Sequence, residues 1–360
     1  MYPAPFNTWT TAYDQWAHDL TQNQERMFAW WRLILDPKPP VAAATPADVV
    51  YQENKLQLLR YRSQTLSNRP VPILMVPSII NKYYILDLKP GRSLVEYLLG
   101  RGFDVWIIDW GIPSDEDRLD TFDKYINGYL ARSVQKVLDL TGQEQLSLLG
   151  YCIGGTFTAI YAALHDHQIR NLIQLAAPIN FHDDGILSAW ASKEAFPIDV
   201  VVDAFGNMPK WLMQTSFQWL RPTNDLAQAV NLWERLDDPK KTDDFLTLRS
   251  WLNDNIDFPG EAYRKYIRDC YQDNLLVQNR MQIDGDTVDL GRITANLLTV
   301  SATQDHICPP RSAAVLNDLV SSQDKQVLTL AGGHIGVVAG SGASKGLWVK
   351  LGDWLAQRSG

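Results

Sequence analysis

The sequence predicts an α/β fold that is built on a mostly parallel β-sheet. Short apolar runs alternate with segments of helical length, and this order is typical of parallel strands joined by right-handed crossovers. The runs are apolar at nearly every position, as expected for strands that helices cover on both faces. They lie at residues 71–76, 104–109, 146–150, 172–176, 297–302 and 327–330.

The segments between these runs complete the expected core. A hairpin precedes the first parallel strand, with its turn at Glu53–Asn54. We expect helices at 90–100, 122–140, 154–165 and 343–357. The alternation breaks between residues 181 and 290, a stretch rich in Trp and in helix-forming residues. We interpret that stretch as a helical lid inserted between core segments 47–180 and 291–360.

Residues 1–46 predict a helical arm followed by a linker. Trp16, Leu20, Met27 and Trp31 lie near one stripe at helical spacing, and the prolines at 37–40 end the helix. Such a stripe either packs on the rest of its own chain or docks a partner. We favour the first alternative, because most amphipathic helices bury their apolar face on their own fold.

Composition excludes several classes of protein. The 360 residues include 41 acidic and 33 basic ones, so the net charge is −8, which argues against nucleic-acid binding. The three cysteines are too few for a disulfide framework or a Cys-based zinc site, and we expect a cytoplasmic protein without metal or cofactor. The longest uncharged run, Leu146–Leu164, holds several glycines, so we expect no transmembrane segment. The N-terminus lacks the pattern of a secretory signal.

One local motif carries the chemistry. Gly150-Tyr151-Cys152-Ile153-Gly154-Gly155 has the form G-x-nucleophile-x-G, directly after an apolar strand and before a helix. That context is typical of the nucleophile elbow of the α/β-hydrolase fold. The helix N-terminus favours the thiolate of Cys152. The Ile153 N–H is one candidate oxyanion donor, and we expect the Ile79 N–H, from the loop after the strand at 71–76, to be the second.

An acid and a histidine follow in the chain order that such a fold requires. Asp305 comes just after the strand at 297–302, and His334 just after the strand at 327–330. We predict Cys152 as nucleophile, His334 as its base and Asp305 as the group that orients the imidazole. His306 is an alternative base. Because His306 is adjacent to Asp305 in the same loop, we expect its side chain to point away from the Asp305 carboxylate. A structural role for His306 is therefore favoured.

Other candidate sites are weaker. His165 and His167 form an HxH pair near a helix end, but no third metal ligand accompanies them. Cys270 and Cys308 are interpreted as packed thiols. Neither a P-loop nor a dinucleotide fingerprint is found, because the required glycine spacing is missing. Asp109-Trp110-Gly111 is interpreted as a structural turn at the edge of the site.

Several segments together resemble the polyhydroxyalkanoate synthases. The resemblance covers the chain from about residue 47 to its C-terminus, and the short arm makes it most similar to the catalytic subunit of the two-subunit, class III enzymes. The segments are residues 81–88, Asp109-Trp110-Gly111, 125–129, 150–155, 187–190, 205–209, Gln304-Asp305-His306 with Pro309-Pro310, and 332–336.

The resemblance implies a function. A class III catalytic subunit polymerises (R)-3-hydroxyacyl-CoA, mainly 3-hydroxybutyryl-CoA, to polyester and releases CoA, with a second, non-catalytic subunit, at the surface of cytoplasmic granules. It implies that Cys152 carries the acyl chain, that His334 activates its thiol, and that Asp305 helps to activate the incoming 3-hydroxyl, directly or through His334. A homo-oligomer is compatible with this expectation.

Two alternatives remain. A thioesterase or an intracellular polyester depolymerase uses the same triad, and Cys in place of Ser at the elbow favours the synthase. A non-catalytic granule or scaffold protein with this fold is disfavoured, because Cys152, Asp305 and His334 are all present.

Overall fold

The computed structural model describes residues 6–35, 42–63, 69–220, 222 and 224–359. The chain divides into two compact units. Unit 1 comprises Met1–Val41 and Arg221–Leu252, and unit 2 comprises Ala42–Leu220 and Asn253–Gly360. The linker prolines predicted at 37–40 lie outside the described residues.

Within the described part of unit 2, one sheet has eight strands in the order β1-β2-β6-β3-β7-β8-β11-β12. β1 and β2 form the predicted antiparallel hairpin, and β2 runs antiparallel to β6, from which point every neighbouring pair is parallel. This sheet confirms the predicted α/β fold class. The strands are β1 (Ala47–Glu53), β2 (Leu56–Tyr61), β3 (Ile73–Val76), β6 (Val105–Asp109), β7 (Leu146–Tyr151), β8 (Ile169–Leu175), β11 (Asn296–Ala302) and β12 (Lys325–Leu330).

The strand register brings three loops to the same edge of the sheet. Tyr151, the last residue of β7, pairs with Leu175 of β8, and Ala302 at the end of β11 pairs with Leu330 at the end of β12. Parallel strands share the edge at which their carboxyl ends lie, and open α/β sheets bind ligands there. The loops that begin at Cys152, Thr303 and Ala331 therefore leave the sheet on one side.

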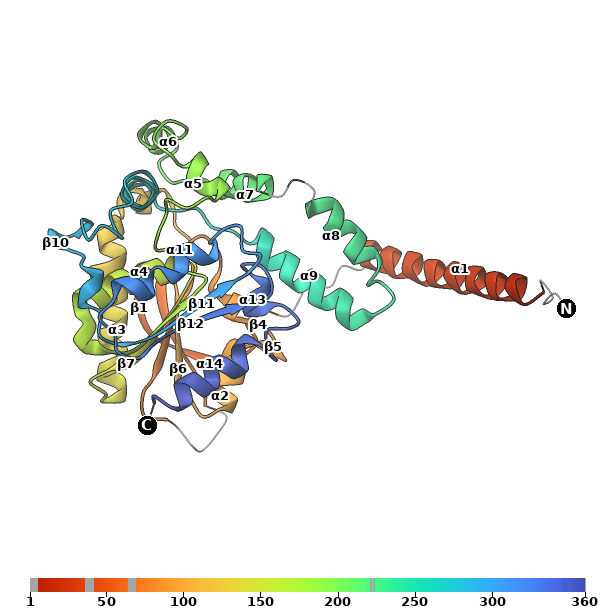
Figure 1. The fold of residues 1–360 in the computed structure, drawn as a ribbon, viewed down its shortest axis with the longest axis horizontal. Coiled ribbons are helices and arrows are strands. Elements are labelled where there is room, and N and C mark those ends of the chain that lie inside the picture. Colours follow the sequence, from red (N-terminus) through yellow and green to blue (C-terminus); the bar gives the residue numbers. More distant parts are fainter. Residues whose placement is uncertain (1–5, 36–41, 64–68, 221, 223, 360) are drawn as a thin grey trace. The chain divides into compact units, whose positions relative to one another are not determined.

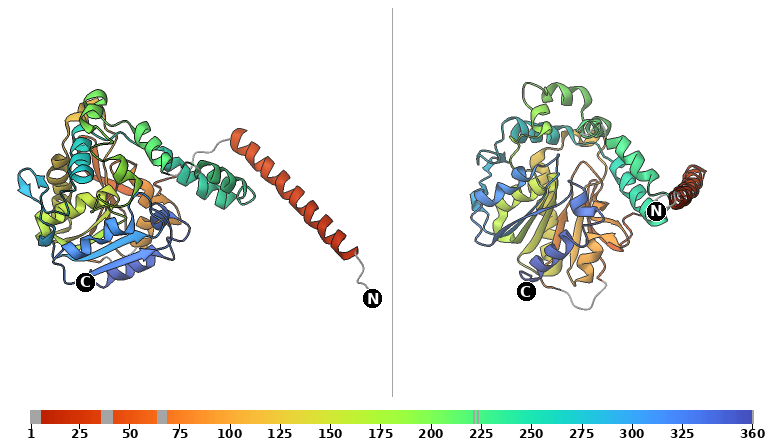
Figure 2. Two further views of the ribbon diagram at one scale, coloured as in Figure 1. Left: turned by 45° about the horizontal axis from the view of Figure 1, so that its top comes forward. Right: turned by 45° about the vertical axis from the view of Figure 1, so that its right-hand side comes forward.

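Helices cover both faces of the sheet. Figures 1 and 2 show α2 (Leu94–Gly100) and α14 (Leu347–Ala356) on one face, and α3 (Ala131–Thr141) and α4 (Ile153–His165) on the other. The predicted helix at 90–100 begins later, at Leu94, since a small hairpin of β4 (Asp87–Lys89) and β5 (Arg92–Ser93) precedes it. The Ser93 side chain caps α2 by accepting a hydrogen bond from the Glu96 N–H at 2.9 Å.

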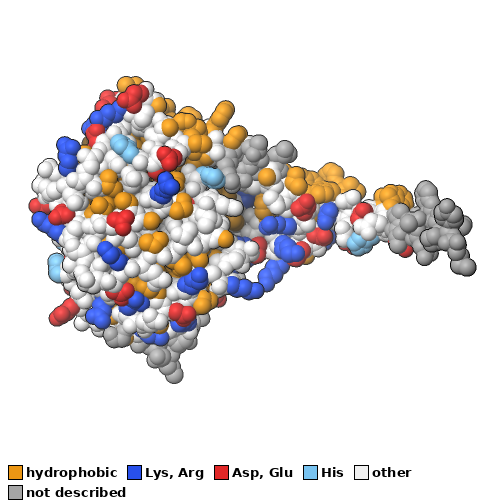
Figure 3. All heavy atoms as spheres, viewed as in Figure 1, with side chains coloured by type: hydrophobic (Ala, Val, Ile, Leu, Met, Phe, Trp, Pro, Cys, Tyr) orange, Lys and Arg blue, Asp and Glu red, His pale blue; other side chains and the backbone are white. Residues whose placement is uncertain are grey.

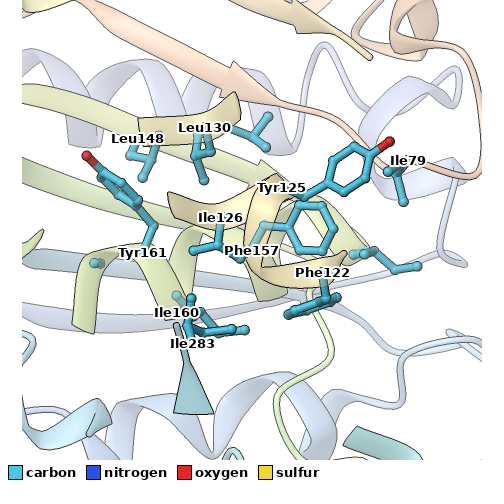
Figure 4. Close-up of a cluster of buried hydrophobic side chains, with 14 of the residues drawn as sticks. Ile79, Phe122, Tyr125, Ile126, Leu130, Leu148, Phe157, Ile160, Tyr161 and Ile283 are labelled. Atoms are coloured by element: carbon cyan, nitrogen blue, oxygen red, sulfur yellow. The ribbon is translucent and has the colours of Figure 1, made fainter. Parts of the chain in front are cut away.

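An aromatic cluster fixes α4 on the sheet. The first part of the helix predicted at 122–140 is a π-helix, η3 (Lys124–Leu130), which packs on α4. Phe122 and Phe157 meet edge to face with their ring centroids 5.1 Å apart, and Tyr125 lies beside Phe157 (Figure 4). All three side chains are buried, so the helix that starts at the elbow rests on a close-packed core.

The predicted lid is shared between the two units. Its unit 2 part holds α5 (Ile186–Trp190), α6 (Ile198–Phe205), α7 (Lys210–Trp219), α10 (Gly260–Lys265) and a second π-helix, η5 (Tyr266–Gln272). Figure 3 shows hydrophobic side chains gathered on the surface near the helices that Figure 1 labels α5, α6 and α7. The exposed large hydrophobic residues of these helices are Ile186, Trp190, Val200, Phe205, Trp211 and Trp219.

Unit 1 holds α1 (Phe6–Leu35), α8 (Asn224–Trp233) and most of α9 (Pro239–Asn253). Arg26 of α1 forms an ion pair with Asp237 at 3.3 Å. The four predicted stripe residues Trp16, Leu20, Met27 and Trp31 are exposed, so within unit 1 the stripe is not buried as the favoured alternative expected. None of the helices in the described ranges combines the length and the apolar character that a membrane span needs.

Short elements complete unit 2. They are the 3₁₀ helices η1 (Tyr83–Leu86), η2 (Asp115–Leu119), η4 (Asp166–Gln168) and η6 (Leu290–Arg292), the helices α11 (Pro310–Ala314), α12 (Leu316–Leu319) and α13 (Gly336–Ala339), and the strands β9 (Gln282–Ile283) and β10 (Asp286–Thr287).

Candidate active site

Cys152 stands on a strained turn between β7 and α4. Its backbone has φ 55° and ψ −128°, a conformation that costs free energy in any residue with a side chain. The Cys152 N–H donates to the Leu175 carbonyl at 3.0 Å, and the Gly155 N–H donates to the Cys152 carbonyl at 2.9 Å. These bonds hold the turn at the head of α4, and the side chain of Cys152 is partly exposed.

Three glycines allow this turn to pack. A Cβ atom on Gly150 would lie 2.3 Å from Thr158 Oγ1, and one on Gly154 would lie 2.1 Å from the Val76 carbonyl oxygen. A Cβ on Gly155 would lie 2.2 Å from the Cβ of Ala177. The Val76 carbonyl oxygen belongs to the backbone of β3, and the Cβ of Ala177 is fixed directly to the backbone, so neither atom can move aside. The elbow therefore has no room for a side chain at these glycine positions.

The loop after β3 is held next to the elbow. Trp110 of the Asp-Trp-Gly turn donates from Nε1 to the Pro77 carbonyl at 3.0 Å, so this turn has a structural role. The Ile80 N–H donates to Ser78 Oγ at 3.2 Å. Ile79, the predicted second oxyanion donor, is fully buried, and its role stays a prediction. Ile153 and Ile80 line the cavity that Cys152 faces.

Asp305 and His334 form a buried pair across the ends of β11 and β12. Nδ1 of His334 lies 2.7 Å from Oδ2 of Asp305, and both side chains are buried. Oδ1 of Asp305 accepts hydrogen bonds from the N–H groups of Ile307 at 2.9 Å and Cys308 at 2.8 Å. With both oxygens engaged, the carboxylate fixes the imidazole so that Nε2 is the free ring nitrogen. His306, the alternative base, is exposed.

Electrostatics connect His334 to Cys152. Burial disfavours the charged imidazolium, but the negative charges of Cys152 and Asp305 outweigh burial and raise the pKa of His334 to about 10. Nε2 of His334 is buried and forms no hydrogen bond with any described residue. The structure thus pairs Asp305 directly with His334, and Cys152 lies near enough for its charge to act on the His334 imidazole.

The remaining candidates lie apart from this chemistry. Cys270 and Cys308 are fully buried, and burial raises the pKa of both thiols well above the ordinary range. Within the part of the chain that the structure describes, no group of three or more His, Cys, Asp or Glu side chains is arranged to hold a metal ion. Nε2 of His165 lies 3.3 Å from Oδ1 of Asn127.

A mostly apolar cavity of about 840 Å³, part of it open to solvent, extends from Cys152 beneath the lid helices of unit 2. Four of its wall residues carry hydroxyl groups, and sequence reasoning missed all of them: Ser216, Tyr263, Tyr266 and Tyr271. They belong to no local motif, and the only sequence signal was their place in an aromatic-rich lid. The lid side chains on the wall include Leu187, Trp190, Leu212, Met213 and Phe217.

Known structures share the fold. Residues 71–340 match the α/β-hydrolase fold family. A monoacylglycerol lipase from Paleococcus ferrophilus superposes with a TM-score of 0.52 at 17% identity, covering 83% of this chain and 99% of the lipase. An α/β-hydrolase fold protein from Nakamurella multipartita gives 0.50 at 15% identity, covering 88% and 99%. The predicted α/β-hydrolase fold is confirmed.

Relatives found by sequence similarity identify the family more narrowly than the shared fold does. Residues 13–98 match the N-terminal family of poly-beta-hydroxybutyrate polymerase. The poly(3-hydroxyalkanoate) polymerase subunit PhaC of Allochromatium vinosum is 39% identical, over 90% of this chain and 92% of its own. The chain belongs to this PhaC family. The PhaC subunit of Thiocystis violacea is 33% identical, over 96% and 98%.

Family membership confirms the resemblance predicted from the motifs. The family match begins at residue 13, so the likeness extends into the N-terminal arm, beyond the expected start at residue 47. The PhaC subunit of Haloferax mediterranei is 42% identical over 88% of this chain, and the matched part of that relative is 64% of its length. The polymerase names of these PhaC relatives support the predicted enzyme class.

Proposed function

We propose that this PhaC chain is the catalytic subunit of a poly(3-hydroxyalkanoate) polymerase, an acyltransferase in which Cys152 carries the growing polyester. The observation that carries the proposal is the buried Asp305–His334 pair, coupled electrostatically to a cysteine on a nucleophile elbow, in a chain of the PhaC family. The substrate is an (R)-3-hydroxyacyl-CoA, mainly 3-hydroxybutyryl-CoA. No further cofactor takes part.

The first step loads the cysteine. The Cys152 thiolate attacks the carbonyl carbon of the thioester, the bond from that carbon to the CoA sulfur breaks, and the His334 imidazolium gives its Nε2 proton to CoA. The charge that develops on the carbonyl oxygen is stabilised by the N–H groups of Ile153 and Ile79. A thiolate suits this exchange, because one thioester replaces another at little cost in free energy.

The second step lengthens the chain. His334, now neutral, accepts the proton of the 3-hydroxyl of an incoming monomer, and that oxygen attacks the acyl carbon on Cys152. An ester bond forms and the Cys152 thiolate leaves, so the chain lies on the new monomer until Cys152 attacks its thioester and releases CoA. Asp305 acts through His334 in this scheme, because its Oδ2 accepts from Nδ1.

Polymer formation, measured with and without a second, non-catalytic synthase subunit, tests the proposal. We expect incubation with (R)-3-hydroxybutyryl-CoA to release CoA together with polymer, and addition of a second synthase subunit to increase the rate. Accumulation of free 3-hydroxybutyrate without polymer, with and without the partner, would instead support the thioesterase or depolymerase alternative. A fully inert chain in both conditions would favour the scaffold alternative.

The lid residues on the cavity wall support a polymerase, because an acyl-cysteine survives between additions only where water is excluded. We expect Phe217→Ala, which shortens a wall side chain, to raise the ratio of free acid to polymer severalfold. Trp219→Ala on the same helix is the matched control, since Trp219 is exposed and does not line the cavity. Product analysis by chromatography measures the ratio, and an equal ratio in the two variants would contradict the shielding role.

The partner and the location follow from the same proposal. The relatives are named subunits, which supports a second, non-catalytic subunit, and the exposed apolar stripe of α1 offers a surface for it. The exposed aromatic residues of α5, α6 and α7 suit an apolar polyester granule in the cytoplasm.

A further inference from the structure

Two tyrosine side chains from one π-helix share the cavity wall with Cys152. Tyr266 and Tyr271 are five residues apart in η5, and the i→i+5 bonding of a π-helix brings such residues to one side, which an α-helix does not. Their ring centroids are 5.6 Å apart with the planes at 84°. π-Helical turns are frequent at functional sites.

Aromatic neighbours hold both rings in place. The Tyr266 ring is stacked with Phe122 and with Phe258, each at 6.1 Å between centroids, and the Tyr271 ring meets Phe181 edge to face at 4.8 Å. Phe122, Phe258 and Phe181 are buried. The tyrosine rings therefore have little freedom to turn, and their hydroxyl groups are presented at defined positions on the wall.

The two hydroxyls interact with each other and with the charge of Cys152: a hydrogen bond joins the Tyr266 and Tyr271 side chains, which leaves the pair one O–H to donate to a third group. Burial is the main cause that raises the pKa of Tyr266 and of Tyr271 far above the ordinary value, and the charge of Cys152 raises the pKa of both further. Both groups therefore stay protonated at physiological pH and lie within electrostatic reach of Cys152. Ser216, another polar residue of the wall, donates its hydroxyl to the Leu212 carbonyl of its own helix at 2.9 Å.

The acyl group on Cys152 has two polar positions inside this apolar space. In the proposed mechanism, backbone N–H groups donate hydrogen bonds to its carbonyl oxygen. The oxygen on carbon 3 needs a hydrogen-bond donor from a side chain of the cavity wall. Leaving a buried oxygen without a hydrogen bond costs about 1–3 kcal/mol. We propose that the linked hydroxyls of Tyr266 and Tyr271 bind the oxygen on carbon 3 of the acyl group that Cys152 carries, through the O–H that is not used between the two tyrosines.

This inference rests on the proposed polymerase function and makes it more specific. Before elongation the bound oxygen is the 3-hydroxyl of the first monomer, and afterwards it is the ester oxygen of the chain. The tyrosine pair thus selects 3-oxygenated acyl groups and sets the direction in which the chain leaves the sulfur. An acyl group without that oxygen gains nothing from the pair.

The test compares two substrates in the acylation step. Single-turnover CoA release is measured with 3-hydroxybutyryl-CoA and with butyryl-CoA, which lacks the oxygen on carbon 3. We expect Tyr266→Phe and Tyr271→Phe each to lower the ratio of the two rates about tenfold, because each variant removes one hydroxyl and keeps its ring. Thermal unfolding checks that each variant is folded.

Tyr263→Phe is the matched control. Tyr263 lines the same cavity and is nearly fully buried, but burial alone raises the pKa of Tyr263, without a contribution from Cys152. We expect this variant to keep the wild-type ratio. An unchanged ratio in both Tyr266→Phe and Tyr271→Phe, or an equal loss with both substrates, overturns the inference. Wild-type protein that acylates with neither thioester overturns the proposed function itself.

Discussion

Replacing Cys152 with Ala is expected to abolish CoA release and polymer formation, by at least about a thousandfold. The reason is that the sulfur forms the covalent bond to the acyl group, and removing a covalent nucleophile from a triad costs more than removing any single binding contact. Cys152→Ser is expected to retain only slight activity, since an alkoxide is much harder to form than a thiolate. Release of CoA is followed with a thiol reagent, and polymer by its mass.

The other two cysteines supply the controls. Cys270→Ala and Cys308→Ala are expected to keep most of the activity, because both thiols are fully buried and burial holds the pKa of each far above neutrality. For the same reason, alkylation of the native wild-type protein is expected to modify Cys152 alone, as found by peptide mass mapping. Loss of activity in Cys308→Ala with full activity in Cys152→Ala would overturn the assignment of the nucleophile.

The second large effect concerns the titration of His334. In the wild type we expect its imidazole to titrate with a pKa of about 10, so it is an imidazolium at neutral pH. In Cys152→Ala the pKa of His334 is expected to fall, because the charge of Cys152 is the largest contribution that raises it and burial then opposes the charged form with less compensation. NMR of protein labelled at histidine measures both values.

The sign of the linked stability follows from the direction of this shift. The folded-state pKa of His334 lies above its ordinary value of 6.5. The stability that the imidazolium contributes is therefore fully present below pH 6.5 and is lost as the pH rises toward 10. Denaturant unfolding of the wild type across this range measures the loss. A His334 pKa that is unchanged by Cys152→Ala would show that the two side chains are not coupled.

Sequence reasoning reached the parts of the fold that local patterns encode. The apolar runs predicted the strands of the parallel part of the sheet, because strands covered on both faces are apolar at most positions; β12, at the edge, is largely exposed and is the exception. The glycines around Cys152 predicted the elbow, because only a residue without a side chain fits there. Element boundaries were predicted less accurately. The helix expected at 90–100 is α2, which begins at Leu94 because the preceding residues pair as a small hairpin.

For the site, the glycine motif indicated Cys152, and chain order indicated Asp305 and His334. Each follows the end of a parallel strand, and parallel strands deliver such residues to one edge whatever the intervening sequence is. The geometry favours His334 over His306 as the base, since Oδ2 of Asp305 lies 2.7 Å from Nδ1 of His334 while His306 is exposed, and the catalytic role of His334 stays a prediction.

The cavity could be identified only from the tertiary structure. Its wall joins Ile80 from the loop after β3, Phe217 from α7, and Tyr266 and Tyr271 from a π-helix. No sequence pattern relates these segments, because side chains meet in a cavity through the packing of elements that are distant along the chain. The sequence by itself therefore determined which sulfur, carboxylate and imidazole this PhaC chain brings to one edge of a sheet. Only the tertiary structure decided which side chains surround these three groups, because the packing of distant segments, and not the order of residues along the chain, places side chains around a cavity.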